Sequence, residues 1–230
     1  MTNRKFALPQ RFHDSRWLIA CELALVAAVF IADRYHHIYL SKTPYLLVLA
    51  WLSIRLRGMR WRDVGFCIPA QWRRLIGIGV AAGVAMELLE LFVTQPVLVA
   101  LTGKYPDLSE IHQLVGNFPL LLLAVAGSWI LAGLGEELAW RGYILNRVAD
   151  LSGRNRLGWA ISIGVVSVVF GLAHSYQDIT GIIENSLDGA LLALLYMACG
   201  RNLLAPIVTH GVTDTVDSLI VYFGHYPGMH

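Results

Sequence analysis

The sequence predicts an all-α fold, a polytopic bundle of about seven (six to eight) transmembrane helices. Of the 230 residues, 56% are hydrophobic and 15% are charged, whereas a typical soluble domain has about 25% charged residues. The hydrophobic residues also gather in long runs. Cys21, Cys67 and Cys199 are isolated, so neither a CxxC metal site nor a disulfide framework is indicated. The net charge of +2 gives no reason to expect a nucleic-acid partner.

Seven apolar runs give the expected helices, each able to cross or nearly cross a hydrocarbon core of about 30 Å at about 1.5 Å per residue. They cover approximately residues 17–32, 45–54 with an upstream extension over 38–40, 75–101, 118–148, 157–174, 187–199 and 203–222. The third run is expected to be interrupted at Pro96, and dividing it there gives an eighth helix. Segment 55–74 is basic and aromatic, which is typical of the lipid headgroup level.

The distribution of Lys and Arg predicts the orientation. With seven spans, the basic segments on one side are the N-terminus, segment 55–74, loop 147–156 and Arg201. The loops on the other side, around Asp107/Glu110 and Asp178/Glu184, are acidic. Because basic loops face the cytoplasm, we expect a cytoplasmic N-terminus. The compact chain favours an integral protein of a bacterial inner membrane.

Charged residues inside the later runs are the candidate functional residues, because charge is expensive in lipid. Glu137 and Arg141 are four residues apart and share a helix face, which predicts a buried ion pair. Glu136 is rotated from Glu137 by about 100° and is free to face other helices. The alternative interpretation is a charge cluster at a helix end that reaches surface water.

Two further pairs repeat this four-residue spacing: Phe170 with His174, and His210 with Asp214. If the fourth helix continues past Arg141 to about residue 148, these groups can meet Glu136 in the cytoplasmic half or near the middle of the membrane. Such a cluster can activate water. Either a bound metal acidifies the water, or the glutamate acts as general base while the imidazoles polarise a carbonyl group. HExxH and GxSxG motifs are absent from the sequence.

Three motifs, in this order, resemble those of the CPBP family, the CAAX prenyl endopeptidase and bacteriocin-processing group of intramembrane proteases, also called the Abi family. They are Glu136-Glu137-x-x-x-Arg141, Phe170-x-x-x-His174 and His210-x-x-x-Asp214. The resemblance covers about residues 118–220, and patch 62–66 also looks like a short segment that such proteins often carry. It implies N-terminal helices over 1–117 and a catalytic core over 118–224 within one integral domain. It also implies an endopeptidase that acts on a peptide or a membrane-associated protein.

The resemblance implies a role for each of the matching residues. Glu136 activates the hydrolytic water, and Glu137 supports the site with Arg141 as its partner. His174 and His210 bind a metal or stabilise the oxyanion. Asp214 stands where the prenyl endopeptidases have Asn; it can bind metal, orient His210 or stay protonated, but an ionised Asp cannot donate a hydrogen bond to an oxyanion. If a divalent metal such as zinc is used, its ligands are Glu136, His174, His210 and Asp214. A metal-free glutamate mechanism stays open.

Two other functions stay open from the sequence. One is a non-proteolytic membrane scaffold or immunity protein of the same fold, and the other is a haem or metal transport protein that uses His174 and His210. The acids Glu22, Glu87, Glu90 and Asp188 are interpreted as protonated or interhelically bonded groups. Glu87 and Glu90 can also line a substrate path or a proton-accessible cavity, and Asp217 is a further candidate cavity residue.

Overall fold

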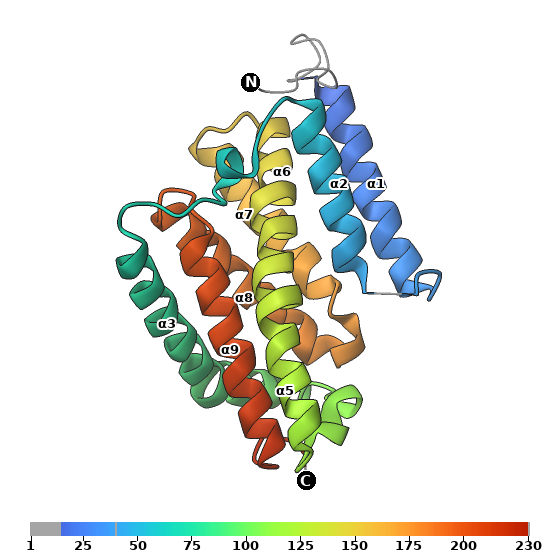
Figure 1. The fold of residues 1–230 in the computed structure, drawn as a ribbon. Helices are drawn as coiled ribbons and strands as arrows, with labels where there is room; N and C mark the ends of the chain where they lie inside the picture. The colour runs from blue at the N-terminus through green and yellow to red at the C-terminus, as the bar shows by residue number, and fades with distance from the viewer. Residues whose placement is uncertain (1–14, 40, 230) are drawn as a thin grey trace.

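The described part of the chain, residues 15–39 and 41–229 of the computed structural model, is helical and contains no strand (Figure 1). The long helices are α1 (Arg16–Arg34), α2 (Lys42–Leu56), α3 (Trp72–Leu89) continuing into α4 (Gln95–Thr102), α5 (Phe118–Gly127) continuing into α6 (Leu145–Leu151), α7 (Arg156–Leu172), α8 (Asp178–Ala198) and α9 (Leu204–Tyr222). The predicted all-α fold is confirmed. The basic N-terminal residues at 1–14, and Leu40 in the expected extension of the second helix, lie outside the described residues.

Three helices within the described ranges are long and apolar enough to cross a membrane: Trp72–Thr102, Phe118–Leu151 and Ser175–Ala198. Large apolar side chains also cover the outer surface; Phe92 and Leu123, for example, are 72% and 69% exposed. Continuous apolar surface of this kind is compatible with lipid and not with water. The chain is therefore an integral membrane protein, and the expected number of about seven spans stays a prediction.

The predicted interruption at Pro96 is a change of helix type and not a break. Residues Glu90–Thr94 form a π-helical segment between α3 and α4, in which the backbone N–H of Gln95 donates to the Glu90 carbonyl. Proline has no N–H and collides with the preceding turn of a regular helix. The wider π turn accommodates Pro96 while the helix continues to Thr102.

The predicted loop around Asp178 and Glu184 is wrong, because α8 begins at Asp178 and not near residue 187. Glu184 and Asp188 are four residues apart on one face of α8, and both line an internal cavity. The charged residues are thus the inner polar face of a helix whose outer face is apolar. Charge density alone made this stretch resemble a loop.

Helices α3 and α9 lie side by side in Figure 1 and pack closely through small residues. A Cβ on Gly79 would lie 2.7 Å from Val208 Cβ, and one on Gly83 would lie 2.8 Å from the Thr209 carbonyl oxygen. Thr209 Oγ1 donates to the Gly79 carbonyl at 3.1 Å. This is the small-xxx-small packing of membrane helices, and it brings the N-terminal helices against the helix that carries His210.

The largest buried cluster surrounds the second half of the long Phe118–Leu151 helix. Trp140 is 1% exposed and packs between the rings of Phe30, at 5.2 Å, and Phe170, at 5.0 Å. Tyr143 and Leu145 belong to the same cluster. Aromatic packing of this kind fixes the rotation of the helix segment that carries Glu136, Glu137 and Arg141.

The predicted headgroup segment 55–74 contains one exception. Arg57 is buried and forms an ion pair with Glu22 of α1, while Ser53 Oγ donates to Glu22 at 2.8 Å. Arg57 therefore joins α1 to α2 instead of anchoring the surface. Arg60 and Arg62 are exposed, as a headgroup segment requires. Glu22 is an interhelically bonded acid, as the sequence indicated.

Candidate active site

The helix that carries the two adjacent glutamates continues without a break from Phe118 to Leu151. The prediction that it extends past Arg141 is confirmed. Two π-helical segments, Ser128–Glu136 and Leu138–Ile144, flank Glu137. The sequence did not indicate them. Because π segments widen a helix locally and occur frequently at functional sites, they single out this part of the helix.

Glu137 and Arg141 form the predicted buried ion pair. The Arg141 Nη1 to Glu137 Oε1 distance is 2.6 Å, and their side chains are 2% and 0% exposed. Arg141 Nη2 also donates to the Gly189 carbonyl at 3.1 Å, and its guanidinium lies 4.8 Å from the centre of the Phe170 ring. The pair thereby fixes the positions of α7 and α8 relative to the glutamate helix.

His210 from α9 reaches the same carboxylate. Its Nδ1 lies 3.0 Å from Glu137 Oε1, and its Nε2 lies 3.7 Å from Asp214 Oδ1. The sequence assigned Glu137 to Arg141 alone and expected His210 to meet Glu136, so the contact of His210 with Glu137 is an addition to that prediction. Its cause is that spacing along one helix reveals same-helix neighbours and not the side chains of a distant helix. Since a carboxylate only accepts hydrogen bonds, Nδ1 of His210 is the donor.

His174 lies in the turn that follows α7. Its Nδ1 is 2.8 Å from the Phe170 carbonyl oxygen, and the two rings are 4.8 Å apart. A carbonyl oxygen only accepts, so Nδ1 of His174 also carries a hydrogen. The motif spacing between Phe170 and His174 thus reflects a backbone hydrogen bond and a ring contact. Both imidazoles are held through Nδ1, which leaves Nε2 as the nitrogen available for chemistry.

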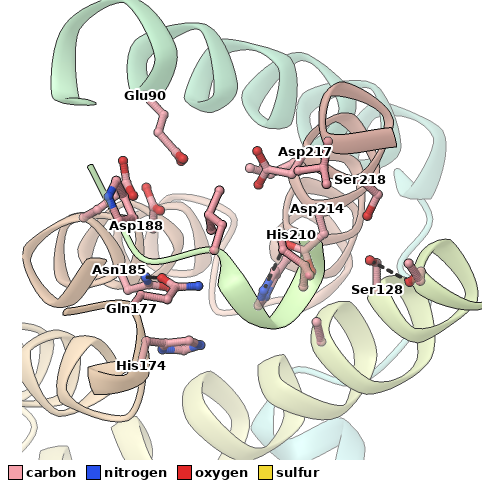
Figure 2. A pocket seen from close by; sticks show the side chains of 18 of the residues that line it. Glu90, Ser128, His174, Gln177, Asn185, Asp188, His210, Asp214, Asp217 and Ser218 are labelled. Carbon is pink, nitrogen blue, oxygen red and sulfur yellow. Dashed lines mark hydrogen bonds and ion pairs between the residues drawn. The ribbon is translucent and has the colours of Figure 1, made fainter. Parts of the chain in front are cut away.

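One cavity of about 370 Å³ connects the predicted residues. Glu136, His174, His210 and Asp214 line it, whereas Glu137 and Arg141 lie behind its wall. Figure 2 shows His174, from the turn after α7, and His210, from α9, on the wall of this cavity. The helix rotation between the adjacent glutamates therefore separates their environments, as the sequence indicated. Glu136 faces open space, and Glu137 is fully enclosed.

The first turn of α2 contributes two residues that the sequence did not reveal. Thr43 Oγ1 donates to Glu136 Oε1 at 3.4 Å, and Lys42 Nζ donates to the Ala173 carbonyl at 3.0 Å, beside His174. Lys42 also lies 3.6 Å from Asp33. A lysine and a threonine at the start of an apolar run look like membrane-surface residues. Only the close approach of α2 to the glutamate helix brings them to the site.

The predicted metal ligands do not form a metal site as they stand. Two imidazoles held through Nδ1 are oriented in the way that proteins orient metal-binding histidines. Within the described ranges, however, no three His, Cys, Asp or Glu side chains are close enough together to hold an ion. The binding of a divalent metal by these residues therefore stays a prediction.

The C-terminal half of the chain matches a known family. Residues 118–216 match the model described as type II CAAX prenyl endopeptidase Rce1-like. The model is one of the CPBP family, and this segment is similar to it. The predicted residues from Glu136 to Asp214 all lie inside the segment. The predicted resemblance is confirmed for this segment, and the match suggests CAAX-type protease activity on a peptide or protein.

Two curated proteins are similar to larger parts of the chain. A protein of Escherichia coli described as an uncharacterized 24.3 kDa protein is 27% identical over 206 residues, which is 84% of this chain and 85% of that protein. Alkane 1-monooxygenase 2 of Pseudomonas aeruginosa is 27% identical over 160 residues, which is 67% of this chain and 38% of that enzyme. No solved structure matches. The similarity to the E. coli protein extends well beyond the segment that matches the CPBP family.

Proposed function

We propose that this protein is a CPBP-family intramembrane endopeptidase in which Glu136 activates water for attack on a peptide bond. The observation that supports the proposal most strongly is a shared cavity: Glu136 faces it together with His174 and His210, and both imidazoles present Nε2. These groups come from three separate helical regions. A general base and two hydrogen-bonding imidazoles at one cavity are what hydrolysis of an unreactive amide needs.

In the proposed reaction, Glu136 takes a proton from water while the water oxygen bonds to the carbonyl carbon of the substrate. The resulting oxyanion accepts a hydrogen bond from Nε2–H of protonated His210. Glu136 then gives its proton to the leaving amine as the C–N bond breaks. Glu137 and Asp214 provide the countercharge for a His210 imidazolium, and Glu137 fixes the ring by accepting from Nδ1. Asp214 acts as a positioning residue in this scheme.

The proposed location is the inner membrane of a bacterium with the N-terminal side in the cytoplasm. The segment before α3, the connection between α6 and α7, and the connection between α8 and α9 lie at the same end of the bundle (Figure 1). These segments contain Arg60 and Arg62, Arg154, and Arg201, respectively. A shared basic end is the pattern that the positive-inside rule assigns to the cytoplasm.

The test is a comparison of protein termini in membranes of cells that express the wild type or Glu136→Gln. We expect new termini with the wild type that are missing with the variant, because the amide cannot accept the proton of water. Glu110→Gln, a change at an exposed glutamate, is the matched control and should give the wild-type set. Identical termini with the wild type and Glu136→Gln would contradict the proposal and favour the scaffold alternative.

The metal is tested separately. Metal content of the purified protein, measured beside cleavage with and without a chelator, decides whether Glu136, His174, His210 and Asp214 hold an ion. A stoichiometric divalent metal together with loss of cleavage in chelator would establish the metal-dependent mechanism in place of the one given above.

A further inference from the structure

A second group of carboxylates lines the same cavity on the side away from His174. We call Glu90, Glu184, Asp188 and Asp217 the acidic arm. Figure 2 shows Glu90, Asp188 and Asp217 around one part of the cavity and His174 at another. No Lys or Arg is present among the described residues that line the cavity. Carboxylates without a cationic partner are costly at membrane depth, and their presence there indicates a function.

Glu184 identifies the missing partner as a hydrogen-bond donor. Glu184 is 5% exposed and lines the cavity, yet its Oε1 accepts no hydrogen bond. A buried acceptor without a donor is destabilising, and more so if it is charged. Glu87 of α3 is 2% exposed and lies beside Asp217, which is also an acid, so neither side chain supplies a cation to the other. The arm therefore has an excess of acceptors.

Glu90 is held rigidly in this arm. Tyr226 Oη donates to Glu90 Oε1 at 2.9 Å, and Gln95 Nε2 lies 3.3 Å from the same oxygen. Gln95 Nε2 also donates to Tyr226 Oη at 2.7 Å. Burial raises the pKa of the Tyr226 phenol well above its usual value, so it remains a donor. The π-helical segment Glu90–Thr94 places Glu90 and Gln95 one π turn apart, so that this part of the arm is preorganised.

The spacing of the acids favours an organic cation over a metal ion. Throughout the described ranges, no three acids, histidines or cysteines converge closely enough to ligate an ion. An ammonium or guanidinium group is larger and carries several diverging N–H donors. Carboxylates distributed along two walls of a cavity, on α8 and on α9, suit such a group.

We propose that the acidic arm binds a Lys or Arg side chain of the peptide that is cleaved in this cavity. The inference rests on the proposed function, which it deepens by naming a substrate class. Asp217 is seven residues beyond His210 on α9, or about 10 Å along the helix. An extended peptide covers this distance in about three residues. The basic residue therefore lies within about three positions of the bond that is cut.

A binding experiment tests the arm without any proteolysis. The probe is hexylammonium chloride, with hexanol as its uncharged counterpart, and the readout is thermal unfolding of the purified full-length protein in a neutral detergent. We expect hexylammonium to raise the unfolding temperature of the wild type in a saturable way and hexanol to have no such effect. In Glu184→Gln/Asp217→Asn, the half-saturating concentration should rise at least about tenfold, equivalent to about 1.4 kcal/mol. Glu110→Gln should behave as the wild type.

Three results would overturn the inference. The first is equal stabilisation of the wild type and the double variant by hexylammonium, and the second is stabilisation by hexanol as large as that by hexylammonium. The third is saturable stabilisation by calcium or magnesium chloride, lost in the double variant, with none by hexylammonium, which would identify a metal site. If the double variant fails to fold, Glu184→Gln alone is used, with the same outcomes.

The rate of peptide cleavage provides a second, independent test. A peptide spanning a site found in the comparison of termini is prepared with its basic residue intact or replaced by norleucine. We expect the wild type to have at least about a tenfold higher kcat/KM for the basic peptide, and Glu184→Gln to lose this preference. Equal kcat/KM values for the two peptides with the wild type would contradict the inference. Identical termini with the wild type and Glu136→Gln would instead contradict the proposed function, while the hexylammonium result still decides which ligand the arm binds.

Discussion

The two parts of the cavity handle buried charge in opposite ways. On the catalytic side, Glu137 is matched by Arg141 at 2.6 Å and by His210 at 3.0 Å. In the acidic arm, Glu184 keeps Oε1 without a donor, as Glu137 does at Oε2, but no Lys or Arg is present among the described residues that line the cavity with Glu184. The first arrangement positions side chains within the protein. The second leaves carboxylates that a cationic group of an entering ligand can pair with. The buried carboxylate behind the cavity wall and those that line the cavity therefore serve different purposes.

The largest expected effect on stability comes from the matched side. Arg141→Met should lower the free energy of unfolding by about 3–5 kcal/mol, because the carboxylate of Glu137 is left buried without its cation. The measurement is reversible unfolding in mixed micelles. Adding Glu137→Gln should recover a substantial part of the loss, since the double variant has no uncompensated charge. If the single variant is as stable as the wild type, the pair does not support the site.

Substitution in the acidic arm should change the free energy of unfolding little, or in the opposite direction. Glu184→Gln should leave the free energy of unfolding unchanged or raise it by up to about 1 kcal/mol, because one carboxylate is removed from a group without a cation. The same unfolding assay measures it. A loss of several kcal/mol would mean that Glu184 is satisfied inside the protein, and the contrast between the two sides would not hold.

A buried lysine on the catalytic side, Lys42, can be compared with an exposed lysine, Lys104. The ammonium group of Lys42 donates to the Ala173 carbonyl and its side chain is 11% exposed. Lys104 instead pairs with Asp178 at the surface, where both side chains are about half exposed. Lys42→Met should cost about 1.5–3 kcal/mol, and Lys104→Met less than about 1 kcal/mol. Because the Ala173 bond holds the His174 turn, kcat should also fall in Lys42→Met. Equal costs for the two lysines would contradict this role.

The smallest expected effect concerns the direct neighbour of the general base. Thr43→Ala removes a donor 3.4 Å from Glu136, and a single neutral hydrogen bond contributes about 0.5–1.5 kcal/mol. A fall in kcat/KM of about two- to tenfold, with unchanged folding, is expected. Thr43→Ser keeps the hydroxyl and should restore most of the rate; failure to do so would assign the effect to packing.

The sequence predicted what lies along a single helix better than what lies between helices. The four-residue spacing of Glu137 and Arg141 predicted their ion pair, and the depth that Glu136 needs in order to meet His174 and His210 predicted the continuation of the helix past Arg141. The contact of His210 with Glu137 and the approach of Lys42 to the His174 turn depend on helix packing, which spacing does not encode.

Charged residues were the other reason why predictions from the sequence were wrong. Asp178 and Glu184 were interpreted as a loop because a charged helix face and a loop have similar composition. Arg57 was assigned to the membrane surface because its neighbours are basic, although it pairs with Glu22 between α1 and α2. The π segments around Glu137 and before Pro96 had no sequence signal other than the proline.

The rate of cleavage by purified Glu136→Gln, compared with Glu110→Gln and the wild type in the same liposomes, tests the central claim most directly. General-base catalysis contributes about 10²–10⁴-fold, so kcat should fall by that factor in Glu136→Gln while the unfolding temperature stays unchanged. A kcat within about threefold of the wild type would show that Glu136 is not the base, because the loss of a general base costs far more than that.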